Sequence, residues 1–307
     1  MILVTEFMDE GAVARMSDAY PTMYAPDLAD QQQNIPNFLN SVKVLIVRNR
    51  TRVNQELLNE APDLEMVGRL GVGLDNIDLD ACAQRGIYVK PAIGANTLSV
   101  AEYVVTNAAI LTRNAYQAKK EMLAGEWPRS RCTGREVAGC KMGLIGFGEI
   151  ARATAKLARA LGMTTCAHDP FLPEDSPLWN GTDPMGFDEV LALSDIVSLH
   201  VPLTNDTRHI INAERLTQMK ASAVLINAAR GGVVDEAALA HALRSEQIAG
   251  AALDVFEAEP LSADAAQMFA GLPNLILTPH VAGVTQDSNF RVSAMIADTV
   301  LAYLSRN

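Results

Sequence analysis

The sequence predicts an α/β protein with two doubly wound parallel-sheet domains, one of which is inserted into the other. Three observations lead to this prediction. Short β-branched runs alternate with helical patterns in the first third of the chain, and the alternation starts again after residue 140. An amphipathic pattern over residues 285–305 then closes the chain, as expected for a helix that returns to the first domain. The length of 307 residues suits two compact units.

The elements of the first third follow from local patterns. The expected strands are ILVTEF, VKVLIV, LEMVGRL and GIYV, and helices are expected to begin near Asp9, Val53 and Asp78. A long apolar-periodic stretch predicts one helix from Thr97 to Gly125. The segment GEWPRSRCTGREVAGC, rich in arginine and glycine, is then expected to form a loop.

A complete second series of strands and helices occupies residues 141–280. The expected strands are KMGLIGF, MTTCAH, DIVSLHV, SAVLINAA, AGAALDV and NLILTPH. Parallel sheets of this kind bind ligands outside the carboxyl ends of their strands, so the loops after these strands are the places where functional residues are expected.

Composition narrows the class of protein. Hydrophobic residues make up 49% and charged residues 20% of the chain, and the net charge of −11 argues against nucleic acid and anionic membranes as partners. No apolar run approaches the length of a membrane span. The four cysteines have no metal-ligand spacing, so we expect no metal site and free thiols in the cytoplasm.

The segment GLIGFGEIA at 143–151 has the pattern of a dinucleotide site. Gly146 would permit a tight turn, Gly148 would let the backbone approach a pyrophosphate, and Ala151 would let the helix pack closely on the strand. An acidic residue is required about 20 positions later, and Asp169 lies there in AHDP. Because a carboxylate binds ribose hydroxyls and repels a 2′-phosphate, the sequence predicts NAD rather than NADP.

Three polar residues each follow a separate strand of the second series. Arg230 lies in NAARGG, Glu259 in DVFEAEP and His280 in NLILTPH. A guanidinium just past a buried strand is costly unless an anion binds it, and a carboxylate next to an imidazole stabilises its protonated form. We therefore expect the three to converge at one edge of the sheet, where His280 exchanges a proton with a hydroxyl or keto oxygen.

The motifs GFGEIA, HDP, HVPLT, NAARGGVVDE, AALDVFEAEP and LTPHVAG, in that order, resemble the D-isomer-specific 2-hydroxyacid dehydrogenases. Within that family the chain is similar to the phosphoglycerate dehydrogenase-like branch and to its short relatives that use 3-sulfolactate. The resemblance implies a Rossmann NAD domain at 97–283, inserted in a discontinuous flavodoxin-like substrate domain at 1–96 and 284–307. It also implies that Arg230 binds the substrate carboxylate, that Glu259 and His280 form the acid–base pair, and that Asp254 binds the nicotinamide carboxamide.

The site residues that these arguments and the resemblance imply fall into two sets. The expected cofactor-binding residues are Gly146, Gly148, Glu149, Ile150, Asp169, His200, Val201, Pro202, Thr204, Ala228, Arg230, Asp254, His280 and Gly283. The expected substrate-binding residues are Arg48, Arg69, Gly71, Val72, Gly73, Asn96, Arg230 and His280.

The substrate is predicted to be a small anionic D-type 2-hydroxy acid. One carboxylate needs only Arg230, so Arg48 and Arg69 suggest a second anionic group, as in 3-phosphoglycerate or 3-sulfolactate. A glyoxylate or hydroxypyruvate reductase is the alternative if these arginines face solvent. An NAD(H)-sensing protein similar to the family's corepressor relatives is a third reading, although such a sensor has no need of the complete set of Arg230, Glu259 and His280.

A homodimer is expected from the long helix and the loop after it. The helix has apolar positions beyond one core stripe, including Val104, Val105, Ile110 and Leu111, and the family forms twofold dimers through the cofactor domain. Arg129 and Arg131 in the following loop are candidates for reaching the site of a neighbouring subunit.

Overall fold

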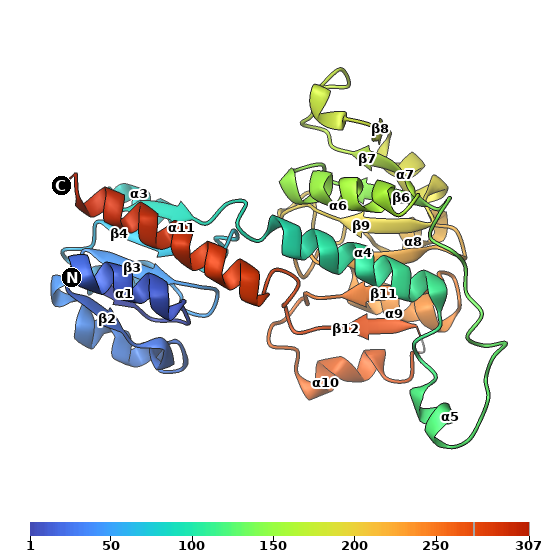
Figure 1. Ribbon diagram of the computed structural model, residues 1–307, viewed down its shortest axis with the longest axis horizontal. Helices are drawn as coiled ribbons and strands as arrows, with labels where there is room; N and C mark the ends of the chain where they lie inside the picture. Colours follow the sequence, from blue (N-terminus) through green and yellow to red (C-terminus); the bar gives the residue numbers. More distant parts are fainter. Residues whose placement is uncertain (273, 307) are drawn as a thin grey trace. The chain divides into compact units, whose positions relative to one another are not determined.

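The chain forms two compact units in the computed structural model, which describes residues 1–272 and 274–306 (Figure 1). Unit 1 consists of Met1–Asn96 and Val284–Asn307, and unit 2 consists of Thr97–Gly283. Each unit has its own sheet, and every strand pair in both sheets is parallel. The predicted α/β class with two parallel sheets is therefore confirmed.

The sheet of unit 1 has the strand order β2-β1-β3-β4-β5. This is the flavodoxin-like order, in which the direction of winding reverses between β1 and β3. The strands are β1 (Ile2–Val4), β2 (Thr22–Tyr24), β3 (Val44–Val47), β4 (Met66–Arg69) and β5 (Tyr88–Pro91). The strand β2 was not predicted; it is a three-residue edge strand whose residues are all only partly buried.

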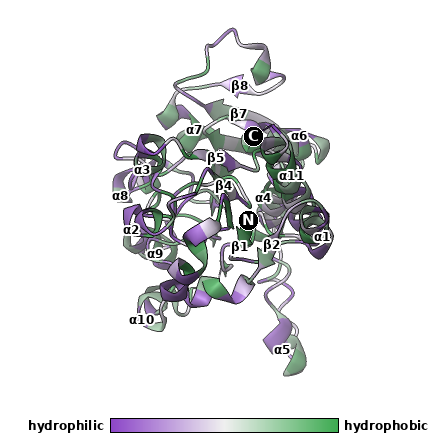
Figure 2. Cartoon of the chain, turned by 90° about the vertical axis from the view of Figure 1, so that its left-hand side faces the viewer, coloured by the Kyte–Doolittle hydropathy of each residue, from purple (hydrophilic) through white to green (hydrophobic). Residues whose placement is uncertain are grey.

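Helices cover both faces of this sheet because successive strand residues point to opposite sides. The face of the sheet that contains Ile2 and Val44 packs against α1 and α11. The opposite face, which contains Leu3 and Leu45, packs against η2, α2 and α3. The helices are α1 (Glu10–Ala19), η1 (Pro26–Asp30), η2 (Gln32–Ser41), α2 (Gln55–Asn59), α3 (Leu79–Gln84) and α11 (Gln286–Leu304). In Figure 2, which colours the chain by hydropathy, β1 and β4 lie between α1 and α11 on one side and α2 and α3 on the other.

The sheet of unit 2 has the order β12-β11-β10-β9-β6-β7-β8. Six of these strands, read as β8-β7-β6-β9-β10-β11, follow the Rossmann order, whose winding reverses between β6 and β9. The strands are β6 (Lys141–Ile145), β7 (Thr164–His168), β8 (Asp183–Pro184), β9 (Ile196–Leu199), β10 (Val224–Asn227), β11 (Gly250–Leu253) and β12 (Leu275–Leu277).

Two hydrophobic cores enclose this second sheet. On one face Met142, Leu144 and Ile226 pack with α4 and α6, and on the other face Val197 and Leu225 pack with α7, α8 and α9. The helices of unit 2 are α4 (Thr97–Arg113), α5 (Lys119–Leu123), α6 (Glu149–Ala160), η3 (Pro177–Trp179), α7 (Phe187–Leu193), α8 (Ala213–Gln218), α9 (Glu236–Arg244), α10 (Ala263–Ala266) and η4 (Gln267–Phe269).

The prediction of a single helix from Thr97 to Gly125 is wrong for the second half of that range. The helix α4 ends at Arg113, and Asn114 then adopts a left-handed conformation with φ of 51°. Asparagine tolerates this conformation better than most residues, and its side chain donates to the Arg131 carbonyl at 2.9 Å. A separate short helix, α5, follows in a segment that extends away from the sheet of unit 2 (Figure 1).

Candidate active site

The glycine-rich turn joins β6 to α6 at the point where the winding of unit 2 reverses. Gly146 has a φ of 85°, and a side chain there would place its Cβ 2.6 Å from the carbonyl oxygen of His200. Only glycine fits this turn without strain. Gly148 is the N-cap of α6, and a Cβ added to it would meet nothing within 4 Å, so the backbone faces open space there.

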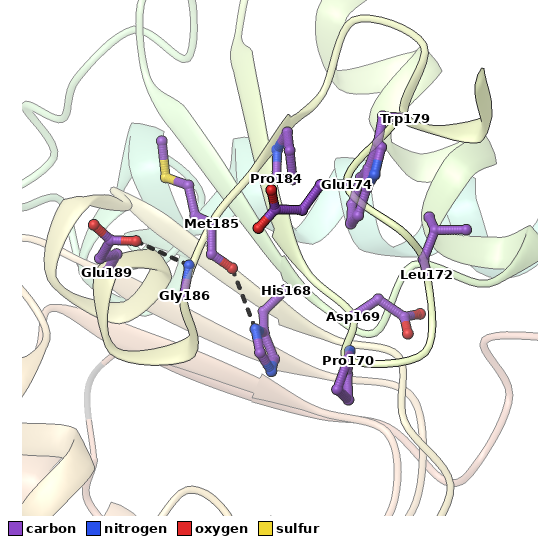
Figure 3. Close-up of a pocket in the computed structure, with 10 residues that line it drawn as sticks. All are labelled: His168, Asp169, Pro170, Leu172, Glu174, Trp179, Pro184, Met185, Gly186 and Glu189. Atoms are coloured by element: carbon purple, nitrogen blue, oxygen red, sulfur yellow. Dashed lines mark hydrogen bonds between the residues drawn. The ribbon is translucent and has the colours of Figure 1, made fainter. Parts of the chain in front are cut away.

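Asp169 lies directly after β7 and is tied to the glycine turn. Its carboxylate accepts hydrogen bonds from the backbone N–H of Phe147 at 2.8 Å and of Phe171 at 3.0 Å. The residue also lines a pocket of about 400 Å³, shown in Figure 3, together with His168, Trp179 and residues of the β8–α7 connection. A carboxylate can accept about four hydrogen bonds, so two backbone donors fix Asp169 and leave capacity for a ligand.

The loop after β9 completes this end of the sheet. The backbone N–H of His200 donates to the Ile145 carbonyl at 2.7 Å, and its Nε2 lies 3.0 Å from the Ser198 hydroxyl. Burial lowers the pKa of His200 to about 4, so its imidazole is neutral at physiological pH. Val201, Pro202 and Thr204 follow in the same loop, where Thr204 and Thr207 bond to each other.

These features fit a dinucleotide. An open turn after β6, a twelve-residue helix that begins at that turn and a fixed carboxylate at the end of β7 are what a pyrophosphate and an adenosine ribose require. Ala228 follows β10, and Gly283 is the last residue of unit 2.

Arg230 lies three residues past β10, in a loop with little freedom. Asn227 donates to the Arg230 carbonyl at 2.9 Å, and the Arg230 Nη1 donates to the Ala229 carbonyl at 2.6 Å. A Cβ on the next residue, Gly231, would lie 1.7 Å from the Phe256 carbonyl oxygen. The loops after β10 and β11 therefore touch backbone to backbone beside Arg230.

Glu259 and His280 form a direct pair at the ends of β11 and β12. His280 Nδ1 lies 2.7 Å from Glu259 Oε2, and the other carboxylate oxygen of Glu259 accepts the Phe256 N–H at 3.0 Å. Burial alone would raise the pKa of Glu259, but the His280 hydrogen bond and charge, the Phe256 N–H and the Arg230 charge together lower it. The carboxylate is thus ionised at neutral pH, and the His280 nitrogen that it contacts is Nδ1.

Asp254, at the end of β11, holds the loop that carries His280. It is 1% exposed and accepts hydrogen bonds from the Thr278 hydroxyl at 2.5 Å and from the N–H groups of Val281 and Ala282 at 2.8 Å. Tyr103 in α4 bonds to the same Thr278 hydroxyl at 2.7 Å, and burial raises its pKa to about 12. Tyr103 and Thr278 were not predicted as site residues, and no pattern around Tyr103 distinguishes it from other residues of α4.

The remaining predicted residues belong to unit 1. Arg48 lies directly after β3, Arg69 ends β4, and Gly71, Val72 and Gly73 follow it, so all five lie at the carboxyl ends of strands. Gly71 has a φ of 150°, and a Cβ there would collide with Arg69 Nη1 at 1.5 Å. Asn96 is the last residue of the first segment of unit 1. The structure brings Arg230, Glu259 and His280 together in unit 2 and places this second group in unit 1.

No three side chains of His, Cys, Asp or Glu within residues 1–272 and 274–306 are arranged to hold a metal ion. None of the helices in the described part of the chain has the length and apolar character needed to cross a membrane.

The fold and the site define a dinucleotide-dependent oxidoreductase, and comparison with known proteins identifies the family of oxidoreductases to which the chain belongs. Residues 105–282 match the family model of the D-isomer specific 2-hydroxyacid dehydrogenase, NAD binding domain. The chain is 50% identical over 300 residues to (S)-sulfolactate dehydrogenase from Chromohalobacter salexigens, with 97% of this chain and 96% of the relative covered.

Two relatives with lower sequence identity are also dehydrogenases. D-3-phosphoglycerate dehydrogenase from Bacillus subtilis is 36% identical over 303 residues, covering 98% of this chain, which spans 56% of the length of that relative. The crystal structure of D-lactate dehydrogenase from Aquifex aeolicus with NAD and lactic acid has a TM-score of 0.87 and 29% identity, covering 99% of this chain and 96% of the other.

The chain belongs to the D-isomer specific 2-hydroxyacid dehydrogenase family. It is an NAD-dependent oxidoreductase that transfers a hydride between nicotinamide and a small anionic 2-hydroxy acid. The prediction of NAD from the glycine turn is confirmed, and a purely NAD-sensing protein is not favoured.

Proposed function

We propose that the protein reversibly oxidises a D-type 2-hydroxy acid that carries a second anionic group. The observation that supports it most is the 2.7 Å pairing of Glu259, in the loop after β11, with His280, in the loop after β12, where β11 is the neighbour of the strand β10 that precedes Arg230. In this assignment unit 2 (97–283) is the dinucleotide-binding domain, and unit 1 (1–96 and 284–307) is the substrate-binding domain.

The three residues have separate roles. Arg230 holds the 2-carboxylate of the substrate through its planar guanidinium. In the oxidative direction His280 takes the hydroxyl proton, while the hydrogen on C2 leaves as a hydride; in the reductive direction the imidazolium returns the proton to the keto oxygen. Glu259 orients the ring and stabilises its protonated form. NAD, when bound, supplies the nicotinamide that accepts or donates the hydride.

The proposed contacts with NAD come from loops at one end of the unit 2 sheet. The Gly146–Ile150 turn would hold the pyrophosphate, Asp169 the adenosine ribose, and Asp254 the carboxamide through the acceptor capacity that its three protein donors leave. The remaining proposed contacts are His200, Val201, Pro202, Thr204, Ala228 and Gly283.

The second anionic group is assigned to Arg48 and Arg69, with Gly71, Val72, Gly73 and Asn96 beside them. Among acids of this kind 3-sulfolactate is favoured, because the relative that acts on it is 50% identical over nearly its whole length. The descriptor (S) is compatible with a D-type enzyme. The sulfur-bearing carbon of sulfolactate outranks the carboxylate in the naming convention, so its (S) isomer has the same spatial arrangement as D-lactate.

Replacing Arg48 with alanine tests the assignment. We expect KM for 3-sulfolactate to rise about tenfold or more, the usual effect of losing a hydrogen bond to a charged group, whereas KM for glycolate should stay near its original value. NADH formation measured with both acids gives the two constants. The exposed Arg52 is the matched control, and Arg52→Ala should leave both unchanged. An equal effect of Arg48→Ala on both acids would favour a substrate of glyoxylate or hydroxypyruvate type.

The protein is further proposed to be a homodimer in the cytoplasm, without nucleic-acid or membrane partners. The segment around α5 exposes Tyr116 at 69%, Leu123 at 79% and Trp127 at 78%, more apolar surface than an isolated loop keeps in water. Both views show this segment extending away from the rest of unit 2 (Figures 1 and 2). All four cysteines are free, as suits a reducing compartment.

Sedimentation velocity at micromolar concentration should give a dimer, and Leu123→Glu should shift the protein to monomer, because a charge would be buried in the contact. Leu178, an exposed leucine in η3, provides the control, and Leu178→Glu should remain dimeric. A wild-type monomer at this concentration would contradict the proposal.

A further inference from the structure

A buried carboxylate lies beneath the loop that follows β3. Glu6, two residues past β1, is 3% exposed. It accepts hydrogen bonds from the backbone N–H groups of Arg48 and Thr51 at 2.8 Å and of Arg50 at 3.2 Å. Because β1 and β3 flank the point where the winding of unit 1 reverses, Glu6 lies at the sheet edge where folds of this type bind ligands.

The same loop is held by two asparagines from other parts of unit 1. The Asn76 side chain donates to the carbonyl oxygens of Arg48 at 3.1 Å and Thr51 at 2.6 Å. Asn289, in the first turn of α11, accepts a hydrogen bond from Arg48 Nη2 at 2.7 Å. The amides of the loop, its carbonyls and the guanidinium of Arg48 are thus each fixed by a different segment of the chain.

This arrangement limits how the loop can recognise an anion. Glu6 occupies the N–H groups that would otherwise form a backbone anion site, so recognition must come from the guanidinium of Arg48. A guanidinium has five donors, and one bond to Asn289 leaves others free to bind. Burial lowers the pKa of Arg48, and the charge of Glu6 opposes that shift. An arginine that is already ordered loses less conformational entropy when an anion arrives.

We propose that Glu6, Asn76 and Asn289 form a clamp that positions Arg48 to receive the second anionic group of the substrate. The clamp makes these three residues determinants of substrate choice, although none of them takes part in the chemistry. The proposal rests on the proposed function, in which Arg48 contacts that group.

Asn289 allows the clamp to be tested near the surface of the unit. Asn289→Ala should raise KM for 3-sulfolactate about tenfold, with little change in kcat and none in KM for glycolate. Asn289→Asp keeps an acceptor but pairs Arg48 with a charge, so it should raise the same KM at least as much, which a purely structural role would not produce. Gln286→Ala, at an exposed position in the same helix turn, should have no effect.

The results separate the clamp from the proposed function. If Arg48→Ala is selective for 3-sulfolactate but both Asn289 variants keep the original KM, the clamp is overturned and the proposed function stands. If both Asn289 variants weaken glycolate as strongly as 3-sulfolactate, the clamp is likewise overturned. If Arg48→Ala itself shows no selectivity, the proposed function fails first.

Glu6 provides a second test from the other side of the loop. Glu6→Gln removes the charge and one of the acceptor oxygens, so it should also raise KM selectively for 3-sulfolactate, with the melting temperature recorded in parallel. The exposed Glu10 is the control, and Glu10→Gln should behave as wild type. If folded Glu6→Gln keeps its original KM for 3-sulfolactate, Glu6 is not part of the clamp.

Discussion

Replacing His280 with glutamine should lower kcat by about 10²- to 10⁴-fold, the range expected when a positioned acid–base group is lost. The imidazole is bonded through Nδ1 to a carboxylate at 2.7 Å, so its orientation and tautomer are set before a substrate arrives. Glutamine retains a polar side chain but cannot accept and return a proton near neutral pH. Steady-state oxidation of 3-sulfolactate measures the loss, and NADH binding by fluorescence should change far less.

The pH dependence of this variant is informative. The pKa of Glu259 is lowered below its ordinary value of 4.5, so the carboxylate supports His280 at neutral pH and loses this role only as pH falls through the lowered pKa. The wild-type rate should therefore fall as pH drops through the lowered pKa of Glu259, and this acid-side loss should be absent from His280→Gln, in which the pair no longer exists. His241→Gln, an exposed histidine on α9, should retain both rate and profile. A His280→Gln enzyme with wild-type kcat would refute the assigned proton transfer.

Replacing Arg230 with lysine should raise KM for every 2-hydroxy acid by about 10- to 100-fold, because an ammonium cannot reproduce two parallel hydrogen bonds to a carboxylate. The main chain around Arg230 is held by Asn227 and by the close approach of Gly231 to Phe256, so the shorter reach of lysine cannot be recovered by movement of the loop. Unlike Arg48→Ala, the change should affect 3-sulfolactate and glycolate alike.

Initial rates with both acids distinguish these two arginines. Arg244→Lys, at an exposed position on α9, controls for the chemical change and should leave both KM values unchanged. A loss confined to 3-sulfolactate in Arg230→Lys would mean that Arg230 binds the second anionic group, and the assignments of the two arginines would have to be exchanged.

Much of the fold and part of the site could be predicted because both depend on strands. Buried parallel strands are short apolar runs, and the residues just past their carboxyl ends meet at one edge, which is how Glu259 and His280 were linked across 21 positions. The β2 and β8 strands were missed because they are brief edge strands with little buried surface. The break after Arg113 was missed because a single left-handed asparagine ends the helix without glycine or proline.

The polar contacts of the site could not be predicted in the same way. Asp254, Thr278 and Tyr103 meet through tertiary packing, and hydrogen bonds between distant polar side chains leave no periodic signal in the sequence. Arg48 and Asn289 are separated by 241 positions and are joined only because α11 packs on the unit 1 sheet. Arg48 was predicted to bind substrate, but no pattern in the sequence indicates which residue orients its side chain.

The segregation of polar residues between the two units has a consequence for how such enzymes diversify. The residues assigned to proton and hydride exchange are all encoded in the inserted segment 97–283, whereas those assigned to the distal anion are encoded in 1–96, and Asn289 of the clamp is encoded in 284–307. If these assignments hold, we expect mutations in the outer segments to change the acid that is accepted without disturbing the redox chemistry. Libraries aimed at altered selectivity should accordingly vary the surroundings of Arg48 and leave the interior of the insert intact.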